Sequence, residues 1–148
     1  MDILTLDEQE RLLVLSRFDE TVAVDLGLAL VAMARDGKLP IVIDIRTPDR
    51  TLFHAAMPGA TPLNDTWARR KSNAALKWQA SSLLVGTRMA AKGDSLTSNG
   101  LSEAEFAVHG GSVPVRVKGV GVVAAVTVSG LPSVEDHALV VRALEALI

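Results

Sequence analysis

The residues with the clearest potential for chemistry follow the last long apolar run of the chain. That run ends at Ser129-Gly130-Leu131-Pro132, and Asp136 and His137 come a few residues later, in the first turn of a predicted helix. A carboxyl group beside an imidazole can serve as an acid, a base or a ligand. Asp136 and His137 are therefore the first candidates for a functional site.

Capping and core packing offer a second interpretation of the same residues. Ser133 with Asp136 forms a capping-box pattern, and acidic residues in a first turn suit the helix dipole. At about 100° per residue, His137 falls on the apolar stripe of this helix. It can then be a buried histidine that is hydrogen-bonded to a backbone carbonyl. Both interpretations stay open at the level of the sequence.

A second group of candidates lies on a helix predicted to begin at residue 61 or 64 and to end near residue 80. Trp67, Lys71 and Trp78 share one face of that helix. A lysine between two indoles can pack along the rings. Alternatively, its amine can hold a carboxylate or propionate at the mouth of a cleft.

Glycines give weaker signals. Gly110-Gly111 lets the backbone bend or approach a ligand closely, whereas Gly119 and Gly121 fit a hairpin turn and the start of a strand. Neither pair belongs to a phosphate-binding loop, because the chain has no GxxxxGK[ST] motif and no GxGxxG motif between a strand and a helix.

Several classes of site are not supported. The chain has 3 histidines, His54, His109 and His137, without zinc-binding spacing, and we expect no metal site. It has no cysteine, which excludes disulfides and thiolate chemistry. Ser129 lacks the GxSxG context of a hydrolase nucleophile.

Length and composition predict one domain over residues 1–148 with an aliphatic core, since only 3% of the residues are aromatic. The net charge of -2, without basic runs, gives no reason to expect nucleic acid or a membrane surface as a partner. The acidic N-terminus does not resemble a signal peptide, and no apolar run is long enough for a membrane span. We therefore expect a cytoplasmic protein.

Hydrophobic periodicity predicts the elements that position these residues. The run over 120–128 is apolar on both faces except at Thr127, which predicts a central strand covered on both sides. The strand at 41–47 alternates and should be half-buried. Helices are expected over 7–17, 20–35, 61–80, 83–90 and 133–148, and strands over 41–47, 51–57, 106–109, 112–118 and 120–129.

Strands that follow one another in pairs predict hairpins and a mostly antiparallel sheet, and the amphipathic helices should cover that sheet. The fold class expected from this order is α+β.

Several strings of the chain resemble the HbpS/GlcG-like family, whose domain is also similar to the C-terminal part of PduO-type corrinoid adenosyltransferases. The resemblance begins at the second helix, is strongest over 106–142, and is closest to small standalone members. It is carried by WARRKSNAALKWQASS (67–82), GGSVPV (110–115), VSGLP (128–132) and EDH (135–137).

This resemblance implies a profilin-like sandwich with an antiparallel sheet between helices, assembly into a homo-oligomer, and binding of haem or a related tetrapyrrole. Lys71 matches the family's helix lysine, Gly110 and Gly111 its glycine element, and Asp136 its aspartate after the last strand. His137 matches the subgroup only. The candidate ligand-binding residues are Lys71, Trp67, Trp78, Gly110, Gly111, Asp136 and His137.

Three functions remain open from the sequence. The first is a small-molecule-binding module, with a tetrapyrrole as the leading ligand. The second is an oligomeric scaffold or interaction protein without a small ligand, which would bury surplus aliphatic residues between subunits. The third is an enzyme that uses Asp136 and His137 as acid and base on a small metabolite. Whether the protein is an enzyme is left undecided.

Overall fold

A five-stranded sheet in the order β1-β4-β5-β2-β3 forms the centre of the molecule. The computed structural model describes all 148 residues. In chain order the elements are α1 (Ile3–Leu12), β1 (Val14–Leu15), α2 (Glu20–Gly37), β2 (Val42–Arg46), β3 (Thr51–Ala56), α3 (Pro62–Trp78), α4 (Ser82–Lys92), a 3-10 turn (Thr97–Asn99), β4 (Ser112–Val117), β5 (Gly121–Ser129) and α5 (Ser133–Glu145).

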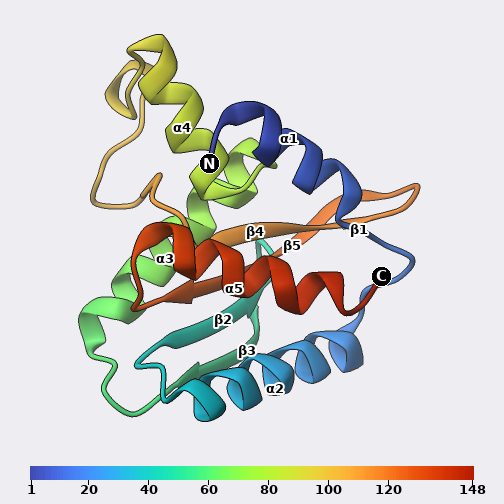
Figure 1. Cartoon of the computed structure of the whole chain (residues 1–148). Helices are drawn as coiled ribbons and strands as arrows, with labels where there is room; N and C mark the ends of the chain where they lie inside the picture. Colours follow the sequence, from blue (N-terminus) through green and yellow to red (C-terminus); the bar gives the residue numbers. More distant parts are fainter.

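Helices cover both faces of the sheet (Figure 1). The helices α2 and α5 pack on one face through a large aliphatic cluster that includes Ile43 and Ile45 of β2 and Val126 and Val128 of β5. The helix α3 packs on the other face, and α4 packs against α1 in a second apolar cluster. Both predicted hairpins are present, β2 with β3 and β4 with β5, and the α+β class is confirmed.

The position of β5 agrees with its composition. It is the third of five strands and pairs on both sides, with β4 and with β2. Its residues from Ala124 to Ser129 are all buried because α5 and α3 cover its two faces. This is the environment that a run without alternating polar residues requires.

The two faces of the sheet differ in chemistry. The residues that point toward α3 include His54 on β3, Asp44 on β2, Thr127 on β5 and Ser112 on β4, and these four lie in one row across the strands. Asp44, Thr127 and Ser112 are buried. The prediction that residues 41–47 form a half-buried strand was therefore wrong: the polar face of β2 is covered by α3 rather than by water.

Several predicted boundaries also differ. The first helix begins at Ile3, capped by Asp2, whose carboxylate accepts a hydrogen bond from Thr5 N at 2.8 Å. It ends before β1, a two-residue strand parallel to β4 that is too short to leave a periodic signal. Residues 106–109 form no strand. Helix α2 reaches Gly37, two residues beyond the predicted end, and the following Lys38 has a left-handed φ of 51°.

None of the helices combines the length and the apolar character that crossing a membrane requires.

Candidate functional site

The candidate site lies at the end of the sheet where β5 stops and β4 starts. Although α3 and α5 pack on opposite faces of the sheet, the first turn of α5 reaches the side chains of α3 at this end. The short connection from Gly130 to Pro132 makes this possible, since it carries the chain directly from β5 into α5.

A buried ion pair joins the two helices. The Nζ atom of Lys71 on α3 lies 3.0 Å from Oδ2 of Asp136 on α5, and it also donates to the carbonyl of Val128 at 3.4 Å. Lys71 is 4% exposed and Asp136 is 0% exposed. Such a pair is costly to desolvate, so its neighbours must complete the hydrogen bonding.

The backbone before α5 provides that completion. The N–H of Leu131 donates to Asp136 Oδ1 at 3.0 Å, and the N–H of Gly130 donates to Oδ2 at 3.4 Å. Ser133 is the first residue of α5, and its hydroxyl accepts a hydrogen bond from Gly110 N. The capping-box interpretation of Ser133 with Asp136 was therefore wrong: Asp136 bonds to the residues that precede the helix, and Ser133 bonds to another loop.

The pKa values of the pair shift toward each other. Burial raises the pKa of Asp136, although the charge of Lys71 and the donated hydrogen bonds oppose this shift. Burial also lowers the pKa of Lys71, although the charge of Asp136 opposes this shift. Both shifts bring the charged pair closer in free energy to the neutral pair, in which the proton resides on the carboxylate.

Gly111 packs directly against these two residues, and Gly110 packs against Ser133. Gly111 has a φ of 139°, and a Cβ there would lie 2.8 Å from Lys71 Nζ and 2.4 Å from the carbonyl oxygen of Val128. A Cβ at Gly110 would lie 2.4 Å from the carbonyl oxygen of Ser133. Only glycine allows the backbone to approach the ion pair this closely.

A pocket of about 240 Å³ opens beside the ion pair. Its outer wall is aromatic: Trp67 and His109 meet edge to face with ring centroids 5.0 Å apart, and Arg70 lies 4.5 Å from the centroid of the Trp67 ring. His109 is exposed, and its ring forms no hydrogen bond. The residues that line the pocket are Asn64, Trp67, Lys71, His109, Ser129, Gly130, Leu131, Ser133 and Asp136.

His137 does not line this pocket. It is 0% exposed, and its Nε2 lies 2.6 Å from Oε1 of Gln9 on α1, while its Nδ1 has no partner. Burial lowers its pKa to about 4, and the charge of the N-terminal amine adds to the shift. Consecutive helical residues point about 100° apart, so Asp136 and His137 face different parts of the molecule. The expected backbone-carbonyl partner of His137 is instead a glutamine side chain.

Trp78 also lies away from the pocket. It packs edge to face against Phe106, with ring centroids 6.4 Å apart, beside the second apolar cluster. Trp67 and Trp78 are separated by about three helical turns, or roughly 16 Å along α3, so one small pocket cannot contact both. The structure thus brings together Trp67, Lys71 and Asp136, with Gly110 and Gly111 packed beside them.

The sequence interpretation missed several residues that line the pocket. His109 is the most informative of these, since it provides an imidazole that the surrounding protein leaves free. It directly precedes the glycine pair, so its position in the chain gave a hint. Asn64, Ser129 and Ser133 carry no such signal, because short polar residues at helix starts and strand ends are common.

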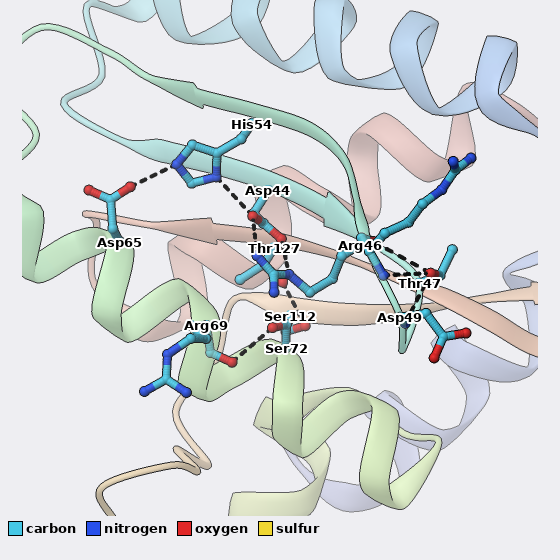
Figure 2. A network of polar contacts seen from close by, with 11 residues as sticks. Asp44, Arg46, Thr47, Asp49, His54, Asp65, Arg69, Ser72, Ser112 and Thr127 are labelled. Atoms are coloured by element: carbon cyan, nitrogen blue, oxygen red, sulfur yellow. Dashed lines mark hydrogen bonds and ion pairs between the residues drawn. The ribbon is translucent and has the colours of Figure 1, made fainter.

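A second polar cluster lies between α3 and the strands β2 and β3 (Figure 2). His54 Nδ1 is 2.8 Å from Asp44 Oδ2, and its Nε2 is 2.7 Å from Asp65 Oδ1. Arg46 donates to both oxygens of Asp44, at 2.7 and 2.9 Å. Partial burial lowers the pKa of His54, but the bonds to Asp44 and Asp65 outweigh it and raise the pKa. This cluster links β2, β3 and α3.

No group of three or more acidic, histidine or cysteine side chains is arranged to hold a metal ion.

Comparison with known proteins identifies close relatives. A UPF0303 protein of Streptomyces coelicolor is 52% identical over 144 residues, which cover 97% of this chain and 91% of the relative. The solved structure of the Ybr137w protein superposes with a TM-score of 0.88 at 31% identity, covering 99% of this chain and 87% of that one. A PduOC–haem complex gives a TM-score of 0.71 at 19% identity, covering 91% and 96%, and shows the shared fold.

The family model described as haem degrading protein HbpS-like matches residues 18–145. This match spans most of the chain and includes α3, the glycine pair, β5 and α5. It confirms the resemblance carried by the strings at 67–82, 110–115, 128–132 and 135–137. The chain belongs to the HbpS-like family.

Proposed function

We propose that the protein is a small-molecule-binding module and that haem or a related tetrapyrrole is its leading ligand. One observation carries the proposal: an aromatic wall with a free imidazole stands at the mouth of a pocket whose inner end is polar and buried. Two comparisons support it. The family is described as haem-degrading, and a solved neighbour with the same fold is a complex with haem.

The imidazole of His109 is the proposed iron ligand. A neutral imidazole is a common protein ligand of haem iron, and it needs a free ring nitrogen. His54 has both ring nitrogens on carboxylates, and His137 is buried against α1. His109 is thus the histidine best placed to coordinate iron without disrupting an existing contact. Trp67 beside it offers an apolar surface for one edge of the macrocycle.

The size of the pocket determines how such a ligand would sit. Sites that enclose drug-sized molecules measure about 300–1,000 Å³, and this pocket of about 240 Å³ is smaller. It would take one edge of a tetrapyrrole, and the rest would lie over the exposed surface. Asn64 accepts a hydrogen bond from Thr61 N through Oδ1, which leaves its amide nitrogen free to donate to a propionate.

Titration of the purified protein with haem, followed by absorbance, tests this function. We expect a saturable shift of the Soret band for the unmutated protein. His109→Ala should bind haem more weakly and give a different Soret band. Trp78→Phe is the control, because Trp78 lies outside the pocket, and it should bind as the natural protein does. Absence of a saturable Soret shift in the unmutated protein would refute the proposal. A haem spectrum of His109→Ala that equals that of the unmutated protein would exclude His109 as the iron ligand.

A further inference from the structure

Lys71 differs from every other lysine of the chain. The other four, at positions 38, 77, 92 and 118, are exposed, whereas Lys71 is 4% exposed and lines the pocket. Its amine is held by one carboxylate and one backbone carbonyl. A lysine amine in such surroundings, next to a group that can take its proton, can act as a nucleophile.

The surroundings favour the neutral amine that a nucleophile requires. Asp136 is 3.0 Å from the Lys71 amine and can accept its proton directly. Burial lowers the pKa of Lys71 and raises the pKa of Asp136, so this transfer costs less than it would in water. The missing side chain at Gly111 leaves the space beside Nζ open, since a Cβ there would lie only 2.8 Å away.

We propose that Lys71 captures a small carbonyl compound that carries a carboxylate, a 2-oxo acid by class, as an imine. The polar groups of the pocket define this class. The amide nitrogen of Asn64 and the hydroxyls of Ser129 and Ser133 line the same space as Lys71, and they can donate to a carboxylate beside the carbonyl group. A volume of about 240 Å³ admits a compound of a few carbon atoms.

The reaction begins with proton transfer from the Lys71 ammonium to the Asp136 carboxylate. The amine nitrogen then attacks the carbonyl carbon, and the electron pair of the C=O π bond moves to oxygen. A proton passes from nitrogen to that oxygen, which gives a carbinolamine. Asp136 next protonates the hydroxyl group, which leaves as water while the nitrogen lone pair forms the C=N bond. The products are a protonated imine on Lys71, one water molecule and the Asp136 carboxylate.

This activity goes beyond tetrapyrrole binding and does not depend on it. Its reacting groups, Lys71 and Asp136, lie at the buried inner end of the pocket, whereas the proposed iron ligand His109 and the ring of Trp67 lie at the mouth. The amide of Asn64 can donate to a carboxylate of either ligand. A ligand at the mouth would nevertheless block access to the inner end.

Reductive trapping with pyruvate tests the proposal. The natural protein is incubated with pyruvate and cyanoborohydride, and peptide mass spectrometry locates the resulting secondary amine. We expect a higher yield of adduct on Lys71 than on Lys77. Lys77 lies on the same helix but is exposed, and it serves as an internal control. Labelling that favours Lys77 and the other exposed lysines over Lys71 would overturn the proposal without requiring any variant.

Two variants separate the roles of the pair. Asp136→Asn keeps the Lys71 amine but removes the proton carrier, and it should slow adduct formation on the order of 100-fold. An unchanged rate would overturn the role of Asp136. Lys71→Arg should abolish the adduct at this position while labelling of Lys77 continues. Circular dichroism of each variant confirms that it is folded before its rate is interpreted.

Haem distinguishes the two proposals. If both hold, haem added first should reduce labelling of Lys71 but not of Lys77. If haem does not bind, labelling of Lys71 should proceed unchanged, and only the tetrapyrrole proposal fails. If haem binds and Lys71 is never labelled, the carbonyl proposal fails alone.

Discussion

At the scale of single residues, Asp136 and His137 show how adjacent positions take different roles. Both are 0% exposed. Asp136 points to Lys71 and to the backbone before α5, whereas His137 points to Gln9 on α1. An acid–base pair needs both groups near one reacting atom. Because these two side chains diverge, we favour Asp136 with Lys71 as the chemical pair and treat His137 as part of the core.

The depressed pKa of His137 predicts a loss of stability in acid. The folded protein holds this imidazole neutral with a pKa of about 4, while the unfolded chain takes up a proton near 6.5. Between these values the unfolded state binds more protons, so the stability contributed by His137 is present above pH 6.5 and is lost as the pH falls toward 4. The full loss is about 3 kcal/mol.

Denaturant unfolding of the natural protein and of His137→Gln over this pH range measures the effect. We expect the unfolding free energy of the natural protein to decline more steeply with acid than that of the variant. Parallel curves would show that His137 is not the group responsible.

At the scale of elements, α3 determines the site. One face of this helix presents Asn64, Trp67 and Lys71 to the pocket. The small buried residues of this helix let it lie close on the sheet: Ala68, Ser72, Ala74 and Ala75. His54 is bonded to Asp44 on β2 and to Asp65 on α3, and it thus links the start of α3 to the sheet. Helix α3 therefore covers the polar face that a half-buried strand would leave to water.

The loop before β4 yields a prediction with a matched control. Gly111→Ala places a Cβ 2.4 Å from the carbonyl oxygen of Val128 and adds the strain of a φ of 139°. Gly119→Ala, in the β4–β5 turn, also has a positive φ, of 77°, but its Cβ would meet nothing within 4 Å. We expect Gly119→Ala to cost about 1 kcal/mol of unfolding free energy and Gly111→Ala clearly more. Equal losses, measured by denaturant unfolding, would show that Gly111 is needed only for its backbone angle.

At the scale of the whole molecule, apolar side chains remain on the surface after the helices have covered the sheet. They come from several elements: Leu4 and Leu12 from α1, Leu63 from α3 and Val120 from the β4–β5 turn, with exposures of 80%, 64%, 64% and 71%. Burial of such side chains between subunits would remove their apolar surface from water, which favours association.

We propose on this basis that the protein forms a homo-oligomer. Sedimentation velocity at micromolar concentration should give a mass above that of the 15.6 kDa chain. Leu63→Lys and Val120→Lys, examined separately, identify the interface, because a charge buried between subunits destabilises the assembly. A monomer across the whole concentration range would contradict the prediction.

The sequence by itself determined the hairpins, the long helices, the central position of β5 and the family. These features depend on local periodicity, on turn residues and on short strings, which can be read without knowing distant contacts. It also singled out Lys71, Asp136 and the glycine pair, first through their residue types and their positions on predicted elements and then through the family resemblance.

Only the tertiary structure decided which of these residues meet. Lys71 and Asp136 are 65 positions apart and lie on helices that cover opposite faces of the sheet. Their contact depends on the tight connection from β5 to α5, and the inclusion of His109 depends on the irregular segment before β4. Trp78 and His137 lie away from the pocket for two different reasons. The rise of the helix separates Trp78 from Trp67 on the same face of α3, and the rotation of about 100° per residue makes His137 point away from its neighbour Asp136. Long-range packing sets such geometry, and no local pattern encodes it.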